Sequence, residues 1–199
     1  MSQTVVMRLF VAVVPPPEAV EHLDEFLDVR REAARFRWTL ADQIHVTLAF
    51  LPEVADRHLD ELVERLGRGA ARRDRFPTRI AGGGAFPHVA GAKVLWAGLA
   101  LDDPGRLQLR RLAEGSRAAA SRTGTTVEGR RFRPHLTVAR MGRPTEVTSW
   151  VRLLDSYEGP PWTVDTVTLI QSHLGEGPRK RPRYEVLADL PVGAGATSS

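Results

Sequence analysis

The sequence contains no cysteine, only two lysines (Lys93 and Lys180) and no long hydrophobic run. The lack of cysteine excludes disulfide bonds, thiolate catalysis and cysteine-based zinc sites. No apolar stretch has the length needed to span a bilayer. The apolar segment at 4–14 is short, is interrupted by Arg8 and runs into three prolines. We therefore expect a buried first strand rather than a signal peptide, a cytoplasmic location and no membrane partner.

The scarcity of lysine means that nearly all the positive charge is arginine. Lysine and arginine total 28 against 24 acidic residues, which gives a net charge of +4 and an isoelectric point near 10.2. Such a balance favours an anionic ligand, because positive potential focused in a cleft raises the local concentration of anions. A general bias towards arginine codons would give the same count. The charge therefore permits a nucleic-acid partner without requiring one.

The chain of 199 residues is long enough for one sizeable domain or for two small lobes that share a core. Helices and strands alternate without a strict one-to-one repeat, which predicts an α+β fold with largely antiparallel sheet. The triplet Gly82–Gly84 is interpreted as a backbone bend, and 193–199 as a disordered tail. Apolar periodicity predicts helices near 15–27, 59–66, 107–122 and 147–154, and extended segments near 4–13, 44–51, 94–101, 125–127, 131–140, 164–170 and 184–187.

One short pattern occurs twice and carries the strongest functional signal. Residues 45–49 read His-Val-Thr-Leu-Ala, and residues 135–139 read His-Leu-Thr-Val-Ala. Because side chains on a strand alternate between its two faces, each histidine should share a face with its threonine. A single copy is most often the polar outer face of a half-buried strand. Two copies favour two related lobes whose histidines meet across a groove.

Displacement at phosphorus explains why two histidines would be needed. The attacking and leaving oxygens lie on opposite sides of the phosphorus, so one group takes a proton and another gives one. Histidine suits both tasks, since its unperturbed pKa is about 6.5. We therefore predict that His45 and His135 are catalytic, and that Thr47 and Thr137 bind non-bridging oxygens. Arg140 suits phosphate as well, although strand parity places it on the other face unless a bulge intervenes.

Other features are open to two interpretations. Trp38 precedes the first motif, where it is suited either to stack on a base or to pack in the core. Arginines crowd 65–75 and basic residues crowd 179–183, either as solvated faces or as contacts to an RNA backbone. No acidic cluster accompanies either motif, so we predict neither a metal ion nor a cofactor.

At these residues the chain resembles the 2H phosphoesterase superfamily, which is defined by paired His-x-Thr/Ser motifs. Within it, the sequence is similar to the bacterial and archaeal RNA 2′,3′-cyclic phosphodiesterases, long called 2′-5′ RNA ligases. The resemblance runs from about residue 7 to 188, with departures at Gln171 and at 51–53. The segments that carry it are 8–12, 38, 45–51, 84–87, 94–98, 132–140, 169–174 and 184–187.

The resemblance implies a bilobal fold with approximate two-fold symmetry, outer helices and a central active-site groove, within one domain at 1–192. It implies hydrolysis of RNA 2′,3′-cyclic phosphate ends to 2′-phosphomonoesters, with His45 as acid and His135 as base. Weak, reversible, ATP-independent 2′-5′ joining of RNA is also implied. We expect a monomer. Two alternatives stay open: a sister phosphoesterase acting on small cyclic nucleotides or ADP-ribose cyclic phosphate, and a non-catalytic RNA-binding module.

Overall fold

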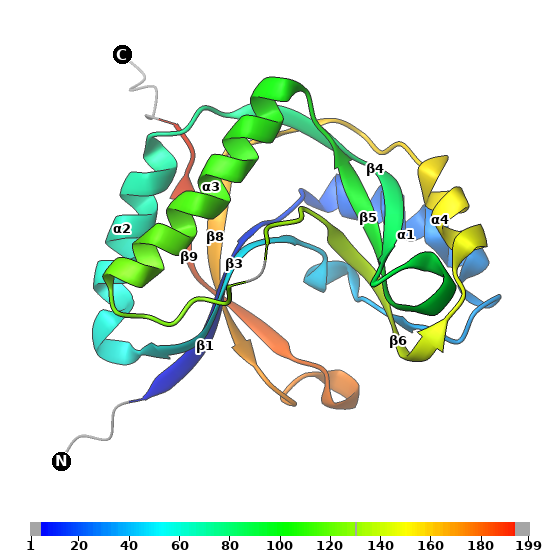
Figure 1. Cartoon of the computed structure of the whole chain (residues 1–199), viewed down its shortest axis with the longest axis horizontal. Helices are drawn as coiled ribbons and strands as arrows, with labels where there is room; N and C mark the ends of the chain where they lie inside the picture. The colour runs from blue at the N-terminus through cyan, green and yellow to red at the C-terminus, as the bar shows by residue number, and fades with distance from the viewer. Residues whose placement is uncertain (1–4, 130, 194–199) are drawn as a thin grey trace.

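The computed structural model describes residues 5–129 and 131–193 (Figure 1). The predicted tail therefore lies almost wholly outside the described residues. The helices are α1 (Pro17–Arg31), α2 (Leu59–Ala71), α3 (Asp103–Arg122) and α4 (Thr148–Asp155). The strands are β1 (Val6–Val13), β2 (Arg37–Trp38), β3 (Val46–Ala55), β4 (Phe76–Phe86), β5 (Ala92–Ala100), β6 (Leu136–Thr145), β7 (Trp162–Val164), β8 (Thr166–His173) and β9 (Arg183–Pro191).

The strands form an antiparallel sheet whose two central strands are joined by very few residue pairs. The order is β7-β4-β5-β6-β3-β1-β8-β9, and β2 pairs with β6. The two central strands are joined at one pair of residues, Val46 on β3 and Leu136 on β6. The sheet therefore divides there into two halves. Figure 1 shows α2 and α3 over the half that contains β1, β3, β8 and β9, and α1 and α4 beside the other.

Each half of the sheet is packed by a helix that follows a strand of the other half in sequence. Helix α1 follows β1 but packs near β4, where Phe26 contacts Tyr157 after α4. Helix α3 follows β5 but packs against α2 and β3. The units β1-α1-β3 and β5-α3-β6 thus repeat one connection with approximate two-fold symmetry. This arrangement confirms the predicted bilobal α+β fold, in which the two motif strands lie next to each other.

Helix α3 shows how local sequence sets an element of this frame. The side chain of Asp102 accepts a hydrogen bond from the backbone N–H of Gly105 at 2.7 Å, and Pro104 occupies the first turn. The helix ends just before Gly124, which has a φ of +74°. Its buried face is supplied mainly by leucine and alanine. In the part of the chain that the structure describes, no helix is long and apolar enough to cross a membrane.

The structure corrects several predictions about local structure. The glycine triplet lies inside β4, where Gly82 has a φ of +72° next to a register shift. A Cβ atom at Gly84 would lie 2.1 Å from the ring of Trp96, so glycine leaves room for that ring. Residues 125–127 belong to no strand, and the strand predicted at 131–140 begins at Leu136 and continues to Thr145. The glycine triplet was predicted to be a bend. It is instead part of a β-bulge, and β4 stays paired with β5 before and after that bulge.

Candidate active site

A groove of about 480 Å³ lies where the two halves of the sheet meet, and we call it the central groove. Both halves of the sheet contribute to its walls, together with the connection between β8 and β9. All the residues predicted for the site line it: Trp38, His45, Thr47, His135, Thr137 and Arg140. The groove is also lined by Arg8, Phe10, Arg37, Thr39, Gln43, Phe50, Glu128, Ser172, Leu174, Arg181, Pro182 and Tyr184.

The two histidines are brought together by the contact that joins the halves. Each one immediately precedes its strand, and the next residues, Val46 and Leu136, form the pair between β3 and β6. His45 Nδ1 lies 2.8 Å from the carbonyl oxygen of Gln43, two residues earlier. His135 Nδ1 lies 2.7 Å from the corresponding carbonyl of Arg133. A carbonyl can only accept, so each Nδ1–H donates and each Nε2 is left for the groove.

Aromatic rings enclose both imidazoles. Phe10 stacks on His45 with ring centroids 4.7 Å apart, and Tyr184 meets the same ring edge-on at 5.6 Å. Phe86 meets His135 edge-on at 4.9 Å. These aromatic residues were not among the predicted site residues. The sequence could have indicated them, because all three lie in segments that carry the family resemblance.

This enclosure sets the protonation state of the histidines. Burial lowers the pKa of His45 to about 4, the Gln43 carbonyl opposes the change, and the positive charges of His135 and Arg140 add to it. Burial also lowers the pKa of His135, opposed by the Arg133 carbonyl and assisted by Arg140. Both imidazoles are therefore neutral near pH 7 when the groove holds no anion. Negative charge placed between them would favour protonation.

A register shift turns Arg140 into the central groove. On β5, Leu95 pairs with Ala139 and Trp96 pairs with Thr137, which leaves Val138 as an extra residue on β6. Thr137 and Arg140 consequently share a face although they are three positions apart. Simple alternation would place Arg140 on the opposite face, but a bulge reverses strand parity, which is the condition that the sequence required for Arg140 to reach the site.

The first motif contains the same irregularity. Ala12 pairs with Thr47 and Val11 pairs with Ala49, so that Leu48 is extra and Phe50 shares the face of Thr47. Phe50 therefore occupies the position that corresponds to Arg140 in the other half. The guanidinium of Arg8 lies 4.3 Å from the centre of the Phe50 ring. Positive charge thus reaches the central groove from both halves.

Comparisons with known proteins identify the family of this chain. Residues 15–176 match the model of the 2′-5′ RNA ligase superfamily. The chain belongs to this superfamily. An Aeropyrum pernix protein named RNA 2′,3′-cyclic phosphodiesterase is 32% identical over 151 residues, covering 74% of this chain and 83% of that protein. An Archaeoglobus fulgidus protein of the same name is 30% identical over 187 residues, covering 94% and 99%.

Solved structures show a similar fold. The crystal structure of E. coli LigT in complex with 3′-AMP has a TM-score of 0.74 and 27% identity to this chain. The match covers 94% of this chain and 99% of LigT. The fold of this superfamily member is therefore that of LigT over nearly its whole length.

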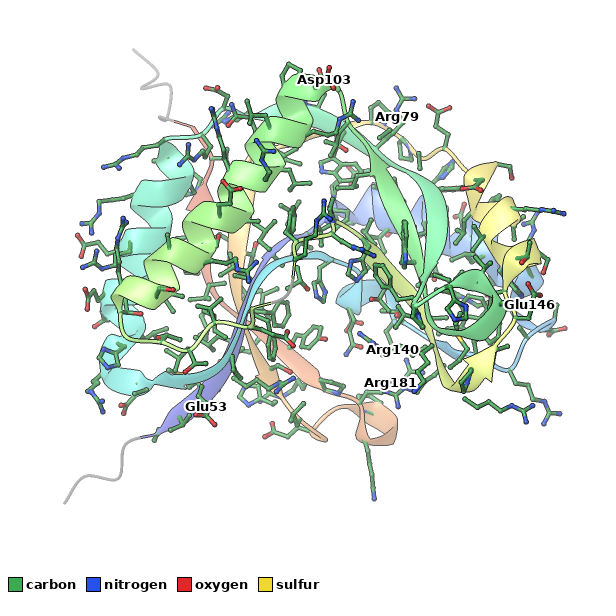
Figure 2. The ribbon with its side chains drawn as sticks, in the orientation of Figure 1. Glu53, Arg79, Asp103, Arg140, Glu146 and Arg181 are labelled. Atoms are coloured by element: carbon green, nitrogen blue, oxygen red, sulfur yellow. The ribbon has the colours of Figure 1, made fainter. Side chains whose placement is uncertain are left out.

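The central groove of this superfamily member is strongly basic. Arginines at positions 8, 37, 140 and 181 line it, together with Glu128, the one acidic residue among its described lining residues. Figure 2 labels Arg140 on β6 and Arg181 in the connection between β8 and β9. Within 5–129 and 131–193, no group of three or more histidine, aspartate or glutamate side chains could hold a metal ion. The four arginines therefore supply guanidinium groups that could meet a phosphate in the groove.

Two further residues support the walls of the groove. Trp38 lines it and also packs against Trp150, with ring centroids 5.2 Å apart, so its ring takes part in the aromatic packing, and stacking on a base stays a prediction. Gln43 donates through Nε2 to the carbonyl of Pro182 at 2.7 Å. Because Gln43 also accepts the Nδ1–H of His45, it links the β8–β9 connection to the position of that ring.

Proposed function

We propose that this superfamily member hydrolyses the 2′,3′-cyclic phosphate at RNA ends to a 2′-phosphomonoester. The observation that carries the proposal is the matched pair of imidazoles, each fixed through Nδ1 and each presenting Nε2 to one basic groove. The names of the Aeropyrum and Archaeoglobus relatives support the same substrate class. The proposed partner is an RNA with a cyclic phosphate end, bound by a monomer without metal ion or cofactor.

In the proposed reaction, His135 Nε2 takes a proton from water as the water oxygen attacks phosphorus. The bond from phosphorus to the ribose 3′-oxygen breaks, and protonated His45 gives that oxygen its proton. The products are a 2′-phosphomonoester and a free 3′-hydroxyl group. The pair ends with the proton on His135 instead of His45, and exchange with solvent resets it.

His45 must be protonated to act as the acid, although burial lowers its pKa when the groove holds no anion. Its imidazolium gives up a proton readily, and the negative charge of a bound phosphate stabilises that protonated form in the groove. Thr47 and Thr137 donate to the non-bridging oxygens, and Arg140 stabilises the charge that develops on them. Trp38 is proposed to stack on the terminal base.

The same geometry would also join RNA ends. If the 5′-hydroxyl of a second RNA replaces water as the attacking group, the 3′-oxygen leaves in the same way and a 2′-5′ linkage forms. The cyclic phosphate itself supplies the activated group, so ATP is not needed. We propose this reaction as weak, because water competes for the same position. It is reversible, because attack of the 3′-hydroxyl on the new linkage expels the 5′-oxygen and restores the cyclic phosphate.

The decisive assay compares an oligoribonucleotide ending in a 2′,3′-cyclic phosphate with nucleoside 2′,3′-cyclic monophosphates and ADP-ribose cyclic phosphate, all in excess EDTA. We expect the oligonucleotide to be converted to the 2′-phosphate product with the highest kcat/KM. Preference for the small substrates would instead favour the sister phosphoesterase. RNA binding without turnover would identify a binding module.

A histidine substitution tests the role of the pair in the same assay. We expect His135→Ala to lower turnover by roughly 10²–10⁴-fold, the usual span for general acid–base catalysis. Near-normal turnover by a folded His135→Ala protein would refute the mechanism. Activity lost in EDTA and restored by a divalent metal would refute its metal independence.

A further inference from the structure

A second basic groove lies between α2 and α3, away from the central groove. Figure 1 shows these two helices side by side over one half of the sheet. Their contact leaves a hollow of about 580 Å³, which we call the helix groove. It shares no lining residue with the central groove. Its arginines lie at 65, 68, 72 and 73 on the α2 side and at 111 and 122 on α3.

Four of these arginines have no carboxylate partner among the residues that the structure describes. Arg65 and Arg68 form ion pairs with glutamates one turn earlier on α2. Across the described residues, the other four, at 72, 73, 111 and 122, form no ion pair. Nε of Arg73 is buried and makes no hydrogen bond within the described part of the chain. The one acidic lining residue, Glu114, lies 3.7 Å from Arg110. The helix groove therefore holds positive charge that no described carboxylate neutralises.

The arrangement of these side chains suits an extended anion. Arg65, Arg68 and Arg72 recur at helical spacing along one side of α2 and its end. Arg111 and Arg122 lie on the same side of α3, about three turns apart. Gly69 and Gly115 lie between the rows, and a Cβ atom added at either would meet nothing within 4 Å. A ligand can thus approach the backbone between two rows of guanidinium forks, which match phosphate geometry.

We propose that the helix groove binds the phosphodiester backbone of single-stranded RNA. RNA is chosen as the polyanion because of the proposed function, on which this choice rests. Two rows of arginines fit a chain of phosphates better than a single small anion, and backbone contacts of this kind position a nucleic acid without reading its sequence. The groove would hold the body of the RNA and raise the affinity for long substrates.

The test measures how the binding of RNA depends on salt. The probe is a fluorescent single-stranded oligoribonucleotide of about 20 nucleotides with a 3′-hydroxyl end, so that the cyclic phosphate plays no part. The test variant carries Arg72→Gln, Arg111→Gln and Arg122→Gln. The matched control carries Arg35→Gln, Arg57→Gln and Arg152→Gln, which removes three exposed arginines outside both grooves. Circular dichroism melting establishes that each variant is folded.

Each phosphate contact contributes about 0.7 to the slope of log affinity against log salt for single strands. Loss of three contacts should therefore make the slope shallower by roughly 2 in the test variant, with no change in the control. Between about 50 and 200 mM salt, the wild-type protein should then lose roughly 16-fold more affinity than the test variant. The single variants Arg72→Gln and Arg111→Gln should each change the slope by about 0.7, which keeps the test valid if the triple variant unfolds.

Equal slopes in the test variant and the control would overturn the proposal. So would a test variant that keeps its RNA slope but loses binding to vesicles of anionic phospholipid, since the occupant would then be a lipid surface. Turnover of a dinucleotide ending in a 2′,3′-cyclic phosphate is measured in parallel. Failure of that turnover in the wild-type protein would refute the proposed function, whereas the salt slopes decide the helix groove independently.

Discussion

Replacing His45 with glutamine should make the stability of the fold less sensitive to acid. In the folded chain, the surroundings of this ring lower its pKa from 6.5 to about 4. The unfolded chain keeps a value near 6.5, so between these values the unfolded state binds more protons. The free energy of unfolding therefore falls as the pH drops below about 6.5 and stops falling, for this group, below about 4.

The size of the effect follows from the same two values. One pKa unit corresponds to 1.36 kcal/mol, so the full displacement corresponds to about 3 kcal/mol. At pH 5 the expected loss from His45 alone is about 2 kcal/mol relative to pH 7. His45→Gln removes this contribution. Between pH 7 and pH 5, the variant should therefore lose about 2 kcal/mol less stability than the wild-type protein, whatever its stability at pH 7.

Urea unfolding at pH 7 and pH 5, followed by tryptophan fluorescence, measures this difference. His88→Gln is the matched control, because that histidine is exposed and lies outside the central groove. We expect the control to keep the pH dependence of the wild-type protein. Equal pH dependence in the wild-type protein and in His45→Gln would refute the conclusion that burial beside Phe10 and Tyr184 holds His45 neutral.

Three other predictions concern catalysis and packing. The pH profile of kcat/KM on cyclic-phosphate-ended RNA should be bell-shaped, because one proton on the histidine pair is the reactive state. A profile without an acidic limb would contradict this. The loss of rate in the double mutant should be smaller than the product of the losses in the two single mutants, because the two histidines act as a unit. Thr47→Ala and Thr137→Ala should each cost about 1.5–3 kcal/mol of transition-state stabilisation, measured from kcat/KM, with serine at either position restoring most of it. Gly84→Ala should lower the free energy of unfolding by about 1–3 kcal/mol, because the new methyl group would overlap the ring of Trp96, and an unchanged urea midpoint would show that the ring moves freely.

The sequence by itself determined the features that depend on residue type and local spacing. The duplicated motif gave the histidines and threonines of the central groove, and its place on β-forming segments gave two related strands. Apolar periodicity located the four helices of the described chain. The α+β class followed from their order. These features were readable because alternation and helical periodicity are properties of neighbouring residues.

The tertiary structure alone decided what depends on pairing between distant strands. Val138 is an extra residue on β6 because of its register against β5, and this register turns Arg140 into the groove. Strand β4 continues through the glycine triplet because Gly83 and Gly84 pair with Ala97 and Trp96 of β5.

The electrostatics of the site were likewise decided by packing. The low pKa of His45 requires Phe10 and Tyr184, which lie far from it in the sequence, to exclude water from its ring. The arginine rows of the helix groove face each other only because α2 and α3 pack together. Burial, register and opposing charge are relations between distant segments, and no local pattern in the sequence encodes them.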